Sequence, residues 1–233
     1  MGFSVGMFQV DLKEDKYSNP VQLELYGNLR ETEFVLRKLT EDYHFGFELW
    51  EIKQERKVEK DIIVRVELDG KFYDRKVREY IVPETLNAYY LRSEKLLFVE
   101  ANWQQREFSY RAFKRALKLN AQKPVINLLS IFKESDDSTK VNVKRPVPTS
   151  RVVAVSGTNL SNDELVRQLL EEDDGVLNSV VVTYTTGGIT IKFSINIEGG
   201  IWLMGKYDNI ETALQLLQGI YYTYVKPNIE TWT

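Results

Sequence analysis

Apolar residues occupy every second position from Ile189 to Ile197, the most regular alternation in the chain. This period of two predicts a strand with one buried face. Glycine pairs at 187–188 and 199–200 flank the run and are typical of hairpin turns. The sequence therefore predicts a three-stranded meander at Val180–Tyr184, Ile189–Ile197 and Ile201–Lys206.

A helix is predicted on each side of this meander. Ser161 and Glu164 have the spacing of a capping box, and apolar residues follow them at helical spacing. The second helix is expected to begin at Asp208, with its buried side formed by Ala213, Leu214, Leu217, Ile220 and Tyr221. A strand at Arg151–Ser156 completes the order β-α-β-β-β-α.

The first half of the chain shows a similar order. Asn28 and Glu31 are spaced to cap a helix that carries Val35, Leu36 and Leu39. Extended segments are predicted at Val21–Tyr26, Phe45–Ile52, Asp61–Leu68, Lys71–Ile81, Leu86–Leu91 and Leu96–Ala101. Hairpin turns are predicted at Asp69-Gly70 and at Arg92–Lys95, and a last helix at Glu107–Leu119.

The ends of the two halves also match. Two segments align, Leu96–Gln105 and Gly200–Asn209. Each is a predicted final strand followed by an aromatic residue, Trp103 in one and Tyr207 in the other. We interpret this as an internal duplication, with convergence of two unrelated meanders as the alternative. The predicted fold class is α+β with two similar halves, each an antiparallel sheet with a helix before and after the meander, and extra strands in the first half. This order is similar in layout to the duplicated saddle of TATA-binding-protein-like folds, which implies curved sheets with helices on one face and favours a binding function.

A polar segment at residues 133–150 divides the chain. It contains Pro146 and Pro148 and follows the apolar run Val125–Phe132, as a linker would. The predicted organisation is a domain at 1–132, a linker at 133–150 and a domain at 151–233. Residues 1–150 contain 26 Lys and Arg against 24 Asp and Glu, whereas residues 151–233 contain 5 against 10. The first domain therefore leans basic and the second acidic.

Composition excludes several classes of chemistry. The chain has no cysteine, which excludes disulfides, thiolate nucleophiles and iron–sulfur clusters. His44 is the single histidine, so multi-histidine metal sites are excluded as well. No apolar run approaches the roughly 18 residues of a membrane span, and the N-terminus lacks a signal-peptide pattern. A cytoplasmic protein without a membrane partner is therefore expected.

The helix at Glu107–Leu119 carries the strongest functional signal. Arg111, Lys114, Arg115 and Lys118 cluster opposite its apolar side, with no acid between them. Such a face can neutralise several phosphates, and the alternative is the solvated side of a packed helix. The remaining candidate nucleic-acid-binding residues are Arg106, Lys123, Arg75, Lys76 and Arg78, with Lys144 and Arg145 of the linker as further support.

Exposed aromatic residues offer a second route to nucleic acid. Tyr89, Tyr90 and Trp103 lie near the expected edge of the first sheet, where bases could stack on them. Because alternate residues of a strand face opposite sides, only one of the two tyrosines is expected in the core.

The sequence contains no recognisable catalytic constellation, metal site or cofactor motif. The leading hypothesis is a non-enzymatic binding protein that contacts nucleic-acid phosphates through the basic helix face. A protein–protein interaction or structural subunit, including a homo-oligomer, is the alternative, with interfaces at Val125–Phe132 and Tyr221–Tyr224. A carboxylate-based metal-dependent enzyme is a third hypothesis and requires at least three acids that converge in a cleft.

Overall fold

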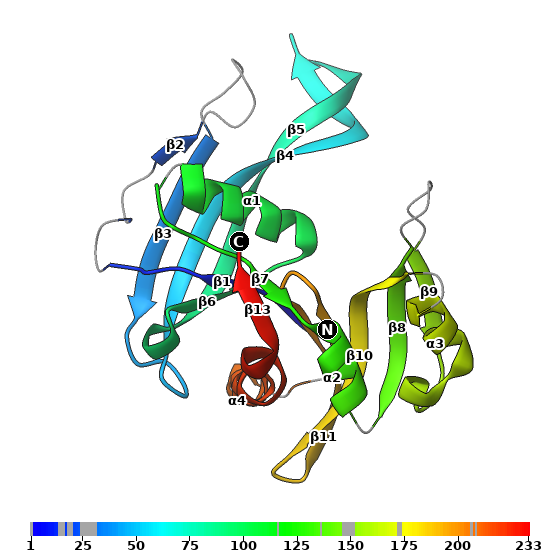
Figure 1. Cartoon of the computed structure of the whole chain (residues 1–233). Coiled ribbons are helices and arrows are strands. Elements are labelled where there is room, and N and C mark those ends of the chain that lie inside the picture. The colour runs from blue at the N-terminus through cyan, green and yellow to red at the C-terminus, as the bar shows by residue number, and fades with distance from the viewer. Residues whose placement is uncertain are drawn as a thin grey trace.

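A computed structural model describes residues 2–13, 17, 21–23, 32–115, 117–135, 137–145, 152–171, 174–205, 207 and 209–233. The protein is mixed α+β, with one large antiparallel sheet and four α-helices in this part of the chain (Figure 1). The sheet has the strand order β2-β3-β4-β5-β6-β1-β12-β11-β10-β8-β9.

The strands of this sheet are β1 Phe3–Gln9, β2 Val21–Leu23, β3 Thr32–Thr40, β4 Phe47–Leu68, β5 Lys71–Leu91, β6 Leu96–Glu100, β8 Ser138–Lys144, β9 Val152–Ser156, β10 Val176–Thr186, β11 Ile189–Asn196 and β12 Gly200–Met204. The helices are α1 Trp103–Arg115, α2 Leu128–Glu134, α3 Glu164–Glu171 and α4 Ile210–Ile220. A separate pair consists of β7 Pro124–Ile126 and β13 Ile229–Trp232. No helix among the described residues has both the length and the apolar character needed to cross a membrane.

Strand β1 lies in the middle of the sheet and joins its two parts (Figure 1). Residues 3–6 of β1 pair with residues 200–203 of β12 on one side. Residues 5–9 pair with residues 96–100 of β6 on the other side. The N-terminal strand therefore connects the meander β4-β5-β6 to the meander β10-β11-β12.

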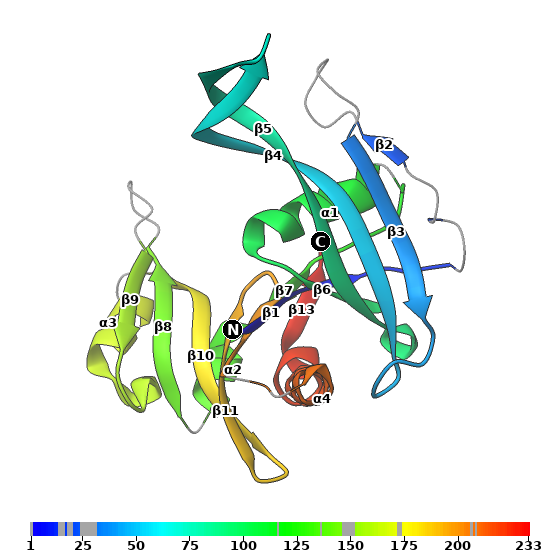
Figure 2. The same cartoon turned by 180° about the vertical axis from the view of Figure 1, so that it is seen from behind.

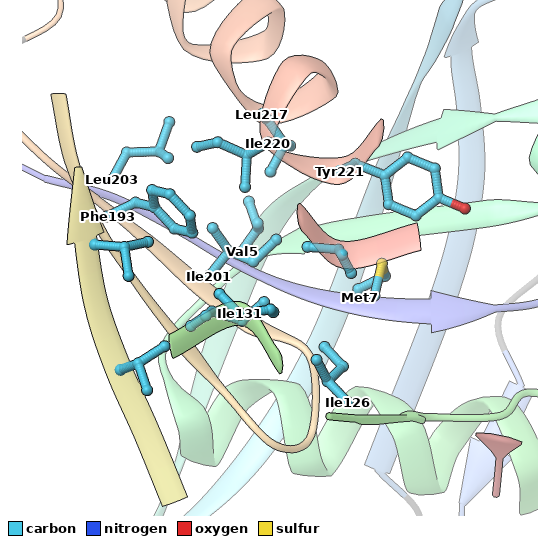
Figure 3. Close-up of a cluster of buried hydrophobic side chains, with 14 of the residues drawn as sticks. Val5, Met7, Ile126, Ile131, Phe193, Ile201, Leu203, Leu217, Ile220 and Tyr221 are labelled. Carbon is cyan, nitrogen blue, oxygen red and sulfur yellow. The ribbon is translucent and has the colours of Figure 1, made fainter. Parts of the chain in front are cut away.

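Two hydrophobic cores flank the sheet. The shared core lies against α2, α3 and α4 and draws on both meanders, with Val5, Met7, Phe193, Ile201, Leu203, Leu217 and Ile220 among its members (Figure 3). The α1 core lies on the opposite face and includes Phe8, Trp50, Tyr90, Phe108 and Phe113. Strands β4, β5 and β6 contribute to both cores, whereas the described residues of β8 to β12 contribute to the shared core alone.

The helix predicted around Val35, Leu36 and Leu39 is wrong, because Thr32–Thr40 forms strand β3. Phe34 and Leu36 are fully buried in the α1 core, while Val35 between them is only half-buried. That period of two is the pattern of a strand. The predicted caps, Asn28 and Glu31, lie outside the described residues.

The predicted linker contains a strand of the sheet. Residues 138–144 form β8, which pairs with β10 on one side and β9 on the other. Val141 and Val143 are buried in the shared core, so the expectation of an exposed loop is wrong for these residues. Pro146 and Pro148 lie outside the described residues, and the division into domains at 1–132 and 151–233 stays a prediction.

Most of the predicted hairpins are confirmed. The turn at Asp69-Gly70 joins β4 to β5, and the short turn after Leu91 joins β5 to β6. The meander β10-β11-β12 also has the predicted turns. Helix α3 is capped by Asp163, whose Oδ1 accepts from the Val166 N–H at 3.1 Å, rather than by Ser161.

The internal duplication stays a prediction. In the described part of the first half, no helix precedes the meander β4-β5-β6, so the orders of elements differ there. The implied layout with helices on one face does not hold for β4 to β6, which have a helix-bearing core on each face. Trp103 and Tyr207 also differ: Trp103 begins α1, whereas Tyr207 precedes α4, whose cap is Asn209. Asp208, the predicted cap, lies outside the described residues.

We expect Ile201→Ala to lower the free energy of unfolding by about 2–5 kcal/mol, because it leaves a cavity in the shared core beside β1. Urea denaturation followed by circular dichroism measures this change. Ile189→Ala is the matched control, since Ile189 is 43% exposed and its truncation should change stability by less than about 0.5 kcal/mol. Two separate unfolding transitions, with only one affected, would contradict a core that both parts share.

Candidate nucleic-acid interface

Helix α1 begins four residues before the predicted start at Glu107. The side chain of Asn102 accepts from the Gln105 N–H at 3.1 Å, and the Gln105 side chain accepts from the Asn102 N–H at 3.0 Å. These reciprocal bonds form a capping box that satisfies the first backbone donors of the helix. Phe108, Ala112 and Phe113 are buried on the side that faces the sheet.

The opposite side of α1 and the residues after it carry four exposed cations, Arg111, Lys114, Arg115 and Lys118. We call these four residues the basic face. Lys114 Nζ lies 2.7 Å from the Tyr110 hydroxyl and 4.8 Å from the centroid of the same ring. Its ammonium group therefore already makes contacts within the protein. Arg111 and Arg115 form no ion pair with any described residue. Arg111, Lys114 and Arg115 therefore lie together on the exposed side of α1. The helix ends at Arg115 rather than at the predicted Leu119, so Lys118 lies in the segment that follows it.

Lys123 and Arg106, in contrast, make internal contacts. Lys123 pairs with Glu107, and its Nζ lies 3.7 Å from a Glu198 carboxylate oxygen. Arg106 Nη1 donates to the Val5 carbonyl at 2.9 Å, and its burial lowers the pKa of the guanidinium. These two cations attach α1 to the rest of the molecule.

Two glycines make room for Arg106. Gly6 of β1 and Gly200 of β12 are paired across the junction of the two meanders. A Cβ added at Gly6 would lie 2.1 Å from Arg106 Cδ, and one added at Gly200 would lie 2.4 Å from Arg106 Nη1. The side chain of Arg106 therefore lies directly on the backbone of the junction and fixes the start of α1 there.

The other predicted cluster, Arg75, Lys76 and Arg78, lies on the hairpin arm, the projecting ends of β4 and β5 at residues 57–80 (Figure 2). All three are exposed. Lys76 Nζ lies 2.8 Å from Asp61, and Arg78 Nε lies 3.9 Å from the same carboxylate. Asp61 therefore offsets part of the positive charge of this cluster, and Arg75 forms no ion pair with a described residue.

A buried polar network sets the position of α1 against β4. Ser109 Oγ donates to Gln54 Oε1 at 2.8 Å, and Gln54 Nε2 donates to Glu84 Oε2 at 3.0 Å. Arg56 donates to Glu84 Oε1 from both Nε and Nη2, at 3.0 and 2.8 Å. Burial of Glu84 would raise its pKa, but the hydrogen bonds from Arg56 and Gln54 outweigh it and hold the pKa below the ordinary value.

A groove of about 340 Å³ runs between α1 and the base of the hairpin arm, lined by Arg56, Val58, Glu59, Trp103, Gln104, Glu107, Phe108 and Arg111. Both signs of charge line it, so its electrostatics do not select an anion. Of the basic face, only Arg111 lines this groove.

The expectation that only one of Tyr89 and Tyr90 is buried is wrong. Tyr89 lies in the shared core and Tyr90 in the α1 core, because β5 is covered on both faces. Neither ring is available for stacking. Trp103 is 59% exposed and remains available.

Sequence reasoning missed another group of exposed residues on strands β8, β11 and β12, namely Lys140, Lys192 and Trp202. The signal was present at residues 189–197. If the isoleucines of this run face the core, the intervening residues must form a solvent face.

Among the described residues, no group of three or more histidine, cysteine, aspartate or glutamate side chains is placed to hold a metal ion. No protein-family model matches the chain, and a search of curated proteins finds no relative.

We expect Glu84→Gln to lower the free energy of unfolding at pH 7 by about 1–2 kcal/mol, a value discounted for partial exposure. The lowered pKa of Glu84 means that its ionised form stabilises the fold above the ordinary glutamate pKa and that this contribution is lost as the pH falls. The difference from the unmodified protein should therefore shrink on acidification. Urea unfolding at a series of pH values tests this, with the exposed Glu67→Gln as control. A difference independent of pH would contradict it.

Proposed function

We propose that the protein is a non-enzymatic binding protein that contacts nucleic-acid phosphates through the basic face. The proposal is carried by one observation: Arg111, Lys114 and Arg115 are all exposed on a helix that is fixed at its start and buried on its other side, and the exposed Lys118 follows its end. A rigid helix presents charges in a constant arrangement, so that phosphate contacts require little ordering of the backbone.

The proposed site excludes Arg106 and Lys123, whose internal contacts hold them in place. It also gives little weight to Arg75, Lys76 and Arg78, because Asp61 pairs with the latter two and offsets part of the charge of this cluster. Four phosphate contacts to duplex DNA correspond to a slope of roughly −3.6 in log affinity against log salt. Binding should therefore be independent of base sequence and should weaken steeply as salt is added.

The expected result is that a 20-base-pair duplex binds the unmodified protein about 100-fold more weakly at 200 mM salt than at 50 mM salt. Reversal of Arg111, Lys114, Arg115 and Lys118 to Glu should abolish binding at 50 mM salt. Fluorescence anisotropy of a labelled duplex measures both quantities.

The control variant must change the net charge equally. Exposed lysines outside the basic face provide it, and Lys13, Lys60, Lys71 and Lys133 changed to Glu should retain most of the affinity. Equal loss in the two quadruple variants would show a general charge effect and would contradict a site on α1. No duplex binding by the unmodified protein at 50 mM salt would end the proposal.

A second candidate function, protein–protein interaction, is favoured by the hairpin arm. Ile63 is 75% exposed and Phe72 is 66% exposed, and both lie on one face of the arm. An isolated two-stranded ribbon is only marginally stable in water, and a protein that packs on these side chains would stabilise it. A second copy of the chain would present the same apolar surface.

If the arm mediates self-association, the unmodified protein should have a mass above that of one chain in size-exclusion chromatography with light scattering. Ile63→Lys combined with Phe72→Lys should restore the mass of one chain, because charged side chains oppose burial of this face. Glu67→Lys adds charge to the same face without removing apolar surface and serves as control. A single-chain mass for the unmodified protein, without any partner, would remove self-association through the arm.

A further inference from the structure

Among the described residues, no helix shares a hydrophobic core with the face of β8, β10, β11 and β12 that points away from the shared core. On this face, called here the open face, one row of paired residues crosses the sheet perpendicular to the strands. The row runs Lys140, Val181, Ser194, Trp202 and Ser4, each residue paired with the next. Adjacent strands are about 4.8 Å apart, so Lys140 and Trp202 are separated by about 14 Å.

The charge on the open face is positive, although the second half of the chain is acidic overall. Strands β1, β8, β9, β10, β11 and β12 contain no aspartate or glutamate. They contain three lysines, Lys140, Lys144 and Lys192, all exposed and none in an ion pair with a described residue. The acids of this half lie outside β9 to β12, for example Glu164 in α3, Glu211 in α4 and Glu230 in β13. The strands therefore present a cationic surface to solvent, with one acid at its margin: Asp137, which precedes β8, accepts from Thr183 Oγ1 at 3.0 Å.

An exposed indole lies within this surface. Trp202 is 48% exposed, although tryptophan usually buries most of its area. A Cβ added at Gly2 would lie 2.2 Å from Trp202 Nε1, so the glycine lets the indole lie close to the backbone that precedes β1. Val181 and Ser194, which lie between Lys140 and Trp202 in the row, have small side chains, and Val181 is only 6% exposed. The half-exposed indole of Trp202 is therefore a planar ring on which a second aromatic ring can stack.

These observations select the chemistry of the partner. Exposed, unpaired lysines on strands without acids complement an anionic chain, and Trp202 complements planar rings attached to that chain. A row of about 14 Å has the length of roughly four stacked nucleotides at 3.4 Å each. We infer that the open face binds single-stranded nucleic acid, with a base stacked on Trp202 and phosphates near Lys140 and Lys192.

A duplex cannot use this site in the same way, because its bases already stack on one another. The inference rests on the proposed function for the class of partner, but none of its residues belongs to the basic face. The two surfaces can therefore fail independently. Loss of the basic face should weaken duplex and single strand alike, whereas loss of the open face should weaken the single strand alone.

The test uses the full chain and two labelled probes, a 20-nucleotide oligothymidine and a 20-base-pair duplex, at 50 mM salt. Trp202→Ala should weaken oligothymidine binding roughly 5- to 100-fold, the effect of losing one stacked base, and leave duplex binding unchanged. Trp202→Phe keeps a ring and should recover part of the loss. Phe45→Ala, which truncates an exposed aromatic side chain outside both surfaces, should have no effect.

A second variant tests the charges. Lys140, Lys144 and Lys192 changed together to Glu should weaken oligothymidine binding more than Lys13, Lys60 and Lys133 changed to Glu, although both variants alter the net charge equally. In addition, oligothymidine should quench the tryptophan fluorescence of the unmodified protein, and quenching should fall in Trp202→Ala.

Oligothymidine affinity unchanged in both Trp202→Ala and the lysine variant would overturn the inference. If the change of the four basic-face residues to Glu still abolishes duplex binding, that result would leave the proposed function standing. Equal weakening of duplex and oligothymidine by Trp202→Ala would also overturn it, because stacking of an unpaired base cannot account for a duplex effect. Absence of binding to both probes would overturn the inference together with the proposed function.

Discussion

The pairing of β1 with both β6 and β12 is the constraint on which the rest of the structure depends. It brings the first residues of the chain beside residues about 200 positions later, and it turns two meanders into one sheet. Val5, Met7, Ile201 and Leu203 then share one core, in which α4 packs against strands of both meanders (Figure 3). Such long-range contacts are costly in loop-closure entropy, so the buried area at this junction has to compensate for them.

The same junction determines which surfaces remain open. Gly6 and Gly200 have no side chains, and Arg106 occupies the space that they leave. This contact fixes the start of α1 at the edge of the first meander. The helix covers β4, β5 and β6, and no described residue of β8 to β12 belongs to the α1 core. The basic face and the open face are consequently separate surfaces on either side of one arginine.

Local signals in the sequence were sufficient for much of the fold. The turn at Asp69-Gly70 and the alternation from Ile189 to Ile197 depend on neighbouring residues, and the structure confirms both elements. Strand β3 was missed because its apolar residues Val35, Leu36 and Leu39 also fit a helical spacing. Strand β8 was missed because it contains only two apolar residues, and its pairing with β10 joins segments almost 40 residues apart. The burial of both Tyr89 and Tyr90 was unpredictable from alternation alone, since it requires a second layer on the other side of the sheet.

The candidate site shows the same division between local and long-range information. The helical period of residues 107–119 was enough to group Arg111, Lys114, Arg115 and Lys118, but not to show that Lys123 pairs with Glu107. Net charge was a poor guide, because it adds residues that face different directions. Residues 151–233 are acidic as a segment of sequence, yet strands β8 to β12 contain no aspartate or glutamate and carry Lys140, Lys144 and Lys192. A phosphate responds to the charges within about a Debye length, roughly 10 Å, so the distribution over each face decides what that face attracts.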